Sequence, residues 1–356
     1  MALDTKGPFR LLSHVQSSLH GLQCVDLVEC AASGRLYIDK NTLLTSCTPE
    51  GRIACAAALH ELDLHFSVIN AHNVVKMEFH LLQGERLHLY HEYCNRGDLL
   101  EIIQQEIRLQ VAGVTPQASF VTTSTDSGRR FIFFSILQGV NALHSAGVAH
   151  MDLSLENVFV TDSGVVKVGD LGHALRFRSD KPNVRISQVA KEAYAAPELL
   201  SHNEIDDARC ADAWSLGVIL WTLCTKQALL HRASLESDRV FCQMVEHGTT
   251  TTLQETDLLS NIPASCIDLL VGLLDVNSRT RISVAAALQH PWVRQETATP
   301  KQHPRRMSIG HVMKKKSEAL IKINQHLAEK ALLARPNSAE IALDLTRITL
   351  RSRNLA

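Results

Sequence analysis

The segment HMDLSLEN, residues 150–157, contains side chains that could accept a proton and hold a metal ion. Asp152 and Asn157 lie five residues apart, and Asp170 follows thirteen residues after Asn157. A carboxylate can act as a general base, and carboxylate and amide oxygens bind hard cations that bridge phosphates. An Asp and an Asn at this spacing also occur as simple turn caps. The run Val148–Val160 contains no lysine or arginine, although phosphate chemistry requires positive charge.

The surrounding sequence predicts a small mostly-β region followed by a larger mostly-α region. Apolar residues at helical spacing predict a helix from Glu50 to Phe66, and the chain is mostly helical from Leu99 onward. The run 112–128 is rich in Ser, Thr and Gly, which indicates a surface loop. The other predicted elements are strands within 24–30, 34–39 and 88–94, helices at 129–147 and 214–224, and a hairpin at 158–170 that turns at 162–164.

The composition of the sequence changes again after Trp292. Residues 294–356 begin as a polar linker and continue with apolar residues at three- or four-residue multiples, which predicts an amphipathic helical tail. Such a stripe must bury itself against the rest of the chain or against a partner. Arg305–Ser308 (RRMS) is a weak match to a phosphorylation site for a basic-directed enzyme.

The composition excludes several classes of protein. The chain has 356 residues, 45% of them hydrophobic, and a net charge of −1, so its bulk charge favours neither nucleic acid nor membrane. No apolar run approaches the roughly 18 residues of a membrane span, and MALDTKGPFR is too polar for a signal peptide. The nine cysteines form no CxxC pair, which argues against a zinc or redox motif. We expect an intracellular protein, cytoplasmic in the first instance, with a nuclear location left open.

Four more motifs follow DLSLEN toward the C-terminus. They are GDLGHA at 169–174, YAAPELL at 194–200, DAWSLGVIL at 212–220 and RTRISVAAALQHPW at 279–292. In this order the five motifs resemble the protein kinase family. The resemblance implies that Asp152 is the base, that Asn157 and Asp170 hold Mg²⁺, and that Asp212 braces the catalytic loop. It also implies an ion pair between Glu198 and Arg281.

The fold implied by this resemblance is α+β and bilobal. We expect a kinase domain over 12–293, with a small mostly-β N-lobe at about 12–93 and a larger mostly-α C-lobe at about 94–293. Residues 294–356 would form the linker and the helical tail. The pattern DLSLEN is of the serine/threonine type rather than the tyrosine type.

The same resemblance extends to the N-terminal region. Lys40 ends the run VDLVECAASGRLYIDK, where the family places the lysine that orients ATP. Such a lysine needs a carboxylate partner on a helix; Glu61 is the first candidate, and Glu50 is the second. Glu50 lies at the predicted helix start, where a carboxylate interacts favourably with the helix dipole.

The adenosine contacts are implied in the same way. Val25 would contact the nucleotide, and His91 would be the gatekeeper residue. The hinge, Glu92 to Cys94, would bind the adenine, and Asp98 would bind the ribose. A polar histidine gatekeeper predicts a modest back pocket.

The first departure from the family pattern concerns the glycine-rich loop. Counting back from Val25, its three glycines would fall at Ser18, His20 and Gln23, and only Gly21 lies nearby. Glycines at these positions let backbone amides approach phosphates closely. Their loss predicts weaker ATP binding and favours a pseudokinase, a scaffold that binds partners without catalysis.

The second departure lies in the catalytic segment itself. Met151 replaces the family's arginine before the catalytic aspartate, and Ser154 replaces the lysine two residues after it. Lys191 occupies the position of a threonine that lies against this loop in similar kinases. We expect Lys191 to supply the missing charge, with a small serine leaving it room; a solvent-facing lysine is the alternative.

These features predict an ATP- and Mg²⁺-dependent kinase that phosphorylates serine or threonine hydroxyls of protein substrates. The predicted catalytic set is Asp152, Lys191, Lys40 and Glu61. The expected partners are protein substrates and a surface, on a partner or on the C-lobe, that receives the tail helix.

Overall fold

The computed structural model describes residues 8–113, 121–178, 180, 182–185, 189–201 and 204–295. The described chain divides into two compact units. The N-terminal unit contains residues 8–69 and 76–93, and the C-terminal unit contains residues 70–75 and 94–295. The predicted tail helix and the RRMS motif lie outside the described residues.

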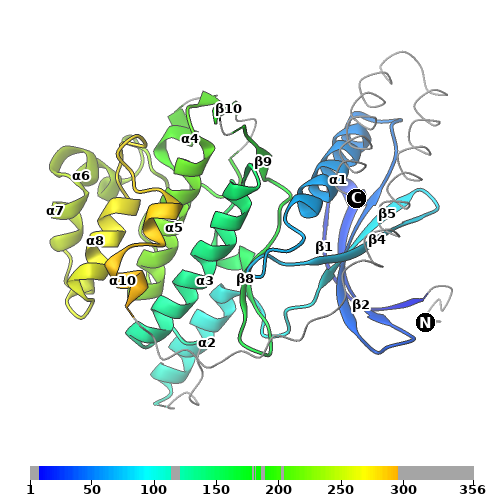
Figure 1. The fold of residues 1–356 in the computed structure, drawn as a ribbon, viewed down its shortest axis with the longest axis horizontal. Coiled ribbons are helices and arrows are strands. Elements are labelled where there is room, and N and C mark those ends of the chain that lie inside the picture. Colours follow the sequence, from blue (N-terminus) through cyan, green and yellow to red (C-terminus); the bar gives the residue numbers. More distant parts are fainter. Residues whose placement is uncertain are drawn as a thin grey trace. The chain divides into compact units, whose positions relative to one another are not determined.

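The N-terminal unit is built on one antiparallel sheet of five strands (Figure 1). The strand order is β1-β2-β3-β5-β4. The bounds are Phe9–Ser18 for β1, Gln23–Cys30 for β2, Leu36–Leu43 for β3, Met77–Gln83 for β4 and Arg86–Glu92 for β5. The three strands predicted from the sequence correspond to β2, β3 and β5. The α+β fold predicted for the family is confirmed.

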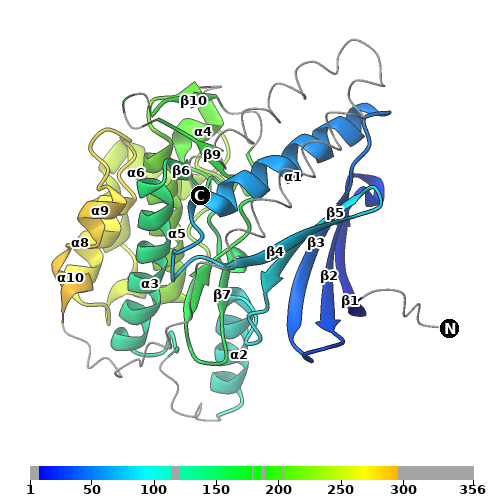
Figure 2. The same ribbon diagram turned by 45° about the vertical axis from the view of Figure 1, so that its right-hand side comes forward.

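Helix α1, Pro49–Ser67, lies across one face of this sheet (Figure 2). It begins where the Thr48 side chain accepts a hydrogen bond from the amide of Gly51, with Pro49 in the first turn, a favourable N-terminal arrangement. Ala58, Leu59 and Leu62 pack with strand residues such as Leu87 and Leu89 in one buried cluster. The helix predicted from Glu50 to Phe66 is therefore confirmed, and its packing fixes Glu61 on the sheet side of the helix.

The C-terminal unit is mostly helical (Figure 1). Its longest helices are α3, Asp126–Ser145, and α5, Ala208–Thr225, which is buried along nearly all of its length. The remaining helices of this unit are α2 (Leu99–Val111), α4 (Pro197–Ser201), α6 (Arg239–His247), α7 (Thr249–Gln254), α8 (Ala264–Leu273), α9 (Val284–Ala287) and α10 (Pro291–Arg294), with short 3₁₀ turns η2 at Leu155–Asn157 and η3 at Asp257–Leu259. A third 3₁₀ turn, η1 at Leu19–Gly21, lies in the N-terminal unit between β1 and β2.

The predicted hairpin is also present in this unit. Strands β7, Val158–Val160, and β8, Val166–Val168, pair antiparallel, with Val158 opposite Val168. Four further short strands form two pairs: β6 (Val148–Ala149) pairs with β9 (Leu175–Arg176), and β10 (Val184–Arg185) pairs with β11 (Glu204–Ile205). The catalytic segment thus connects β6 to β7.

One boundary differs from the sequence prediction. The loop predicted over 112–128 ends earlier than expected, because α3 begins at Asp126. Thr125 caps this helix by accepting a hydrogen bond from the amide of Gly128 at 3.1 Å. The Ser/Thr-rich composition that suggested a loop therefore includes a helix cap.

Candidate active site

A buried carboxylate holds the start of the catalytic segment in place. Asp212 on α5 is fully buried, and its two oxygens accept the backbone amides of His150 and Met151, both at 2.8 Å. The Asp212 Oδ2 atom also lies 2.7 Å from His144 Nε2. Such charge-assisted bonds in a buried setting are strong, so Asp212 braces this loop, as the resemblance implied.

The braced backbone is strained at one residue. Met151, which stands where the family has arginine, has φ of +63°. A left-handed conformation costs a non-glycine residue roughly 1–2 kcal/mol. The hydrogen bonds that His150 and Met151 donate to Asp212 offset that cost and place the next residue, Asp152.

Asp152 and Asn157 are bonded to each other. The Asn157 amide nitrogen donates to the backbone oxygen of Asp152 at 2.7 Å and to its Oδ2 atom at 2.9 Å. The other carboxylate oxygen, Asp152 Oδ1, is buried and accepts no hydrogen bond from the residues that the structure describes. An unpaired buried carboxylate oxygen is costly, and it is suited to accept a proton from a bound hydroxyl group.

Asp170 follows the hairpin at a backbone position that is fixed from several sides. Gly169 donates to the Asn157 carbonyl at 2.9 Å, and its own carbonyl lies 2.9 Å from His150 Nε2. A Cβ at Gly169 would lie 2.7 Å from a Val75 methyl carbon, so glycine is required there. Asp170 has φ of +61°, which aspartate tolerates better than most residues.

These bonds bring the predicted metal ligands close together. The Asn157 amide nitrogen faces Asp152, and the Asn157 amide oxygen accepts none of the hydrogen bonds found among the described residues. An amide oxygen and the Asp170 carboxylate on adjoining backbone segments match the oxygen ligands that Mg²⁺ prefers. The donor set therefore fits the metal that the resemblance implies.

Lys191 lies against the catalytic segment. Its Nζ atom donates to Ser154 Oγ at 2.7 Å and lies 3.4 Å from Glu156 Oε1. Lys191 begins a turn in which the Tyr194 amide donates to the Lys191 carbonyl at 3.1 Å. Ser215 of α5 donates to the Tyr194 carbonyl at 2.8 Å and so holds the turn. The structure thus contains the contact between Lys191 and Ser154 that is needed if Lys191 supplies the charge of the lysine that Ser154 replaces. The catalytic role of Lys191 stays a prediction.

A small cavity separates the two segments. Asp152, Lys191, Tyr194 and Ser215 are among the residues that line a space of about 10 Å³, enough for about one water molecule. Burial, together with the nearby charge of Glu156, raises the pKa of Tyr194 to about 12. Lys191 and Asp152 therefore line the same small space. A larger cavity of about 270 Å³, between α3 and the segment Leu288–Arg294, includes none of the predicted site residues.

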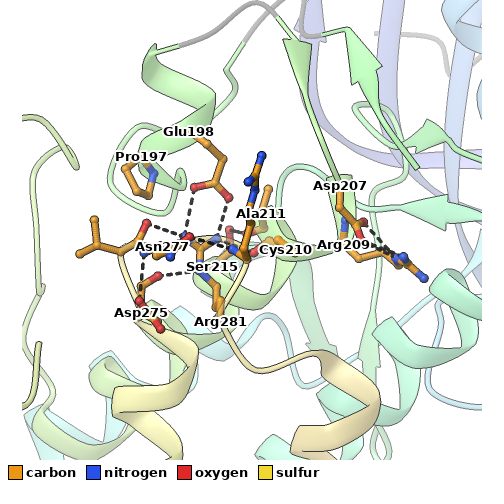
Figure 3. Close-up of polar contacts among 12 residues, drawn as sticks. Pro197, Glu198, Asp207, Arg209, Cys210, Ala211, Ser215, Asp275, Asn277 and Arg281 are labelled. Atoms are coloured by element: carbon orange, nitrogen blue, oxygen red, sulfur yellow. Dashed lines mark hydrogen bonds and ion pairs between the residues drawn. The ribbon is translucent and has the colours of Figure 1, made fainter. Parts of the chain in front are cut away.

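A buried ion pair joins separate segments of the C-terminal unit (Figure 3). Arg281 donates to both carboxylate oxygens of Glu198, at 2.6 and 3.1 Å, and to the Cys210 carbonyl at 2.7 Å. Arg281 is 5% exposed. The pairing of Glu198 with Arg281 predicted from the sequence is confirmed, and it ties the segment after Lys191 to the start of α5.

In the N-terminal unit, Lys40 of β3 pairs with Glu61 of α1. The Lys40 Nζ atom lies 2.7 Å from Glu61 Oε1. Burial alone would raise the pKa of Glu61, but the charge of Lys40 and the contact with His65 hold it well below its ordinary range. Glu50 is exposed in the first turn of α1. Of the two candidate carboxylates, Glu61 is the one that contacts Lys40; that the pair orients ATP stays a prediction.

The other residues predicted to bind nucleotide lie on β2, at the end of β5 and at the start of the C-terminal unit. Val25 of β2 lies opposite Lys40 in the sheet register. The Glu92 carboxylate, at the end of β5, accepts the backbone amide of Lys76 at 2.7 Å. Cys94 is buried at the start of the C-terminal unit. Asp98 caps α2 by accepting the Glu101 amide at 2.9 Å, and burial raises its pKa. The structure shows structural contacts for Glu92 and Asp98; their nucleotide contacts remain predictions.

The turn between β1 and β2 differs from a glycine-rich loop. The two strands stay paired up to Ser18 and Gln23, so only four residues form the turn. Leu19, His20 and Gly21 all have positive φ, at +49°, +55° and +82°. Two of these three residues pay the conformational cost that glycine avoids.

The sequence analysis missed a buried polar cluster next to Lys40. His65 of α1 and His91 of β5 are 3% and 5% exposed, and their Nε2 atoms lie 3.1 Å apart. The His65 Nε2 atom lies 3.8 Å from Glu61 Oε1. The four-residue spacing of Glu61 and His65 on one helix was a readable signal, whereas the approach of His91 depends on tertiary structure.

Comparison with known proteins gives the class of protein that this geometry defines. Residues 31–293 match the family model described as the protein kinase domain, which covers well over half of the chain. The chain therefore belongs to the protein kinase domain family. The matched region begins after β2, so the turn between β1 and β2 lies outside it.

Individual relatives support this assignment. The serine/threonine-protein kinase chk1 of Schizosaccharomyces pombe is 26% identical over 283 residues, covering 75% of this chain and 51% of the relative. The serine/threonine-protein kinase KIN4 of Saccharomyces cerevisiae is 27% identical over 229 residues, covering 64% of this chain and 26% of the relative. The putative CBL-interacting protein kinase 27 of Oryza sativa is 32% identical over 176 residues, or 49% of this chain and 40% of the relative. The chain thus spans only about a quarter to a half of the length of these relatives. No helix in the described part of the chain has the length and apolar character of a membrane span.

Proposed function

We propose that the protein is a catalytically active kinase that transfers the γ-phosphoryl group of ATP, with Mg²⁺, to serine or threonine hydroxyls of protein substrates. The observation that carries this proposal is the arrangement of Asp152. Its carboxylate is fixed through Oδ2 by Asn157, and its buried Oδ1 has no partner among the described residues.

Each residue of the site then has a separate task. Asp152 accepts the proton of the substrate hydroxyl as the new bond to phosphorus forms. Asn157 and Asp170 would hold Mg²⁺, which when bound neutralises charge on the phosphate oxygens. Lys40, oriented by Glu61, donates to the phosphate oxygens of ATP. Lys191 contributes positive charge beside the acceptor hydroxyl, where charge develops during transfer.

A pseudokinase scaffold is the second candidate, and one observation favours it. The turn between β1 and β2 has only one glycine, and Leu19 and His20 adopt left-handed backbone conformations. Side chains in this turn hinder the close approach of backbone amides to phosphates. The intact set Lys40, Asp152, Asn157 and Asp170 favours catalysis.

A transfer assay decides between the two candidates. The full chain is incubated with radiolabelled ATP, Mg²⁺ and a generic basic protein, beside the variant Asp152→Asn. We expect the wild type to label the substrate on serine or threonine and the variant to lose the activity while keeping the same thermal unfolding midpoint. Equal labelling by both proteins, or nucleotide binding with no transfer by the wild type, would contradict the proposal.

A further inference from the structure

Three buried side chains beside Lys40 form a cluster that the proposed reaction does not use in full. Glu61, His65 and His91 each offer one donor atom, and these atoms all lie within 4.8 Å of one another. Glu61 and His65 lie four residues apart on α1, on the face that packs on the sheet, and His91 extends from β5. The cluster lies wholly within the N-terminal unit.

The donor set matches a transition-metal ion of the zinc class. Two imidazole nitrogens and one carboxylate oxygen are a common set of three protein ligands for tetrahedral zinc. Bonds of about 2.0–2.2 Å place the donors of such a site roughly 3.3–3.6 Å apart. The observed separations, 3.1 Å between the two Nε2 atoms and 3.8 Å from His65 Nε2 to Glu61 Oε1, lie on either side of that range. Only small side-chain shifts would be needed.

The facing ring nitrogens provide a second reason. His65 Nε2 and His91 Nε2 point at each other, and two neutral imidazoles can share only one proton along that line. If both rings were charged they would repel each other in a buried site. A divalent cation between them accepts a lone pair from both nitrogens at once.

Lys40 would compete with such an ion for the same atom. Its Nζ lies 2.7 Å from Glu61 Oε1, which is also the Glu61 oxygen that lies nearest to His65 in the described contacts. An ammonium group and a divalent ion repel each other strongly when they share one oxygen in a site of low dielectric constant. The two cations are therefore mutually exclusive partners of Glu61.

We propose that Glu61, His65 and His91 form an inhibitory binding site for a zinc-class ion, and that binding of the ion separates Lys40 from Glu61. The inhibitory consequence rests on the proposed kinase function, whereas the binding and the release of Lys40 do not. The ion acts as a reversible off-switch, because the pair of Lys40 and Glu61 re-forms when the ion leaves.

Zinc binding to the full chain tests the site itself. Zinc chloride is titrated in competition with a chromogenic chelator against the wild type, His65→Leu, His91→Leu and the control His80→Leu. His80 is a suitable control because it is 3% exposed on the neighbouring strand β4 and lies outside the cluster. We expect the wild type and the control to bind one equivalent of zinc. The variants His65→Leu and His91→Leu should bind zinc at least about tenfold more weakly.

Equal zinc binding by all four proteins would overturn the proposal. Circular dichroism and thermal unfolding establish that each variant is folded. The polar variants His65→Gln and His91→Gln replace any leucine variant that does not fold, and they too must lose the zinc equivalent.

A chemical measurement tests the release of Lys40 without any need for kinase activity. The full chain is treated briefly with acetic anhydride, with and without one equivalent of zinc, and the acetylation of Lys40 is measured by mass spectrometry. We expect zinc to increase Lys40 acetylation several-fold in the wild type and the control, and to have no effect in His65→Leu. Unchanged acetylation in the wild type with bound zinc would contradict the competition.

The transfer assay then separates the two proposals. If the wild type transfers phosphoryl groups, zinc should inhibit it far more strongly than it inhibits His65→Leu. If no condition supports transfer, the proposed function is wrong, while zinc binding and lysine acetylation still decide the inference about the metal site.

Discussion

The catalytic segment and the turn between β1 and β2 both lack residues that the family pattern expects, but only in the catalytic segment does the structure bring a residue of the missing charge close to the gap. Ser154 replaces a lysine, and the Nζ atom of Lys191 lies 2.7 Å from its hydroxyl group although 37 residues separate the two. In the turn, Ser18, His20 and Gln23 stand where the family pattern has glycines, and Leu19 and His20 adopt left-handed conformations.

This difference shows that a missing residue must be judged with its neighbours in space. A positive charge can be supplied from any segment that reaches the same point, because the electrostatic effect depends on distance. Backbone freedom cannot be supplied from elsewhere, because it belongs to the residue itself. We therefore expect the catalytic segment to retain its chemistry and the β1–β2 turn to bind phosphate less well.

The largest effect is expected from removing a predicted metal ligand. Asp170→Asn should lower kcat by about 1000-fold or more, because it removes a charge that would hold Mg²⁺ against the phosphates. Steady-state transfer rates, with the unfolding midpoint as a control for folding, measure this. A variant with near wild-type kcat would show that Asp170 does not hold Mg²⁺ during transfer, and that the expected chemistry of the catalytic segment is wrong.

The next effect concerns Lys191. Lys191→Ala should lower kcat by roughly 100-fold, with a smaller change in KM for ATP, because its charge acts on the transferring group rather than on ATP binding. Glu192→Ala is the matched control, since Glu192 is the next residue of the same turn and pairs with Arg232 at 3.3 Å. Similar modest losses in both variants would make Lys191 a surface charge.

The N-terminal unit offers a test of stability with a defined pH dependence. Glu61→Gln should lower the free energy of unfolding by about 3 kcal/mol at pH 7, because it removes the largely buried negative charge that contacts Lys40. The folded-state pKa of Glu61 lies below the ordinary value of 4.5, so the pair stabilises fully above about pH 4.5 and its contribution falls as the pH drops below that.

Denaturant titrations of both proteins from pH 7 to pH 3 measure this dependence. The difference between them should narrow below about pH 4.5, and a constant difference would contradict the assignment. Glu50→Gln, at the exposed start of the same helix, should change stability by less than about 1 kcal/mol at any pH.

The smallest effect is expected in the β1–β2 turn. The triple variant Ser18→Gly, His20→Gly, Gln23→Gly should lower KM for ATP several-fold and leave kcat nearly unchanged, because it permits closer approach of backbone amides to phosphates. Ser33→Gly, in the turn between β2 and β3, is the control. An unchanged KM would mean that this turn does not limit ATP binding.

The sequence predicted those parts of the molecule that depend on local order. Helix α1 and the hairpin of β7 and β8 followed from residue periodicity and turn residues. The pair Glu198–Arg281, whose residues are 83 positions apart in the chain, was implied instead by the resemblance to the family. The contact of Lys40 with Glu61 was foreseen as one of two alternatives. Whether Glu61 or Glu50 contacts Lys40 depends on how α1 packs on the sheet.

Other features could not be read from the sequence. The facing rings of His65 and His91 depend on the distance between α1 and β5, which no local pattern encodes. The positive φ values at Leu19 and His20 follow from strand pairing that continues to Ser18 and Gln23. The sequence showed that glycines are missing there, but not that the turn tightens to four residues.

The double-mutant cycle of Ser154 and Lys191 tests the central claim most directly. The values of kcat are measured for the wild type, Lys191→Thr, Ser154→Lys, and both changes together. If Lys191 supplies the charge missing from DLSLEN, Lys191→Thr alone should lose roughly 100-fold, and the double variant should recover part of that loss. If the double variant is as slow as the product of the two single effects predicts, or if Lys191→Thr retains wild-type turnover, the two residues do not share one role.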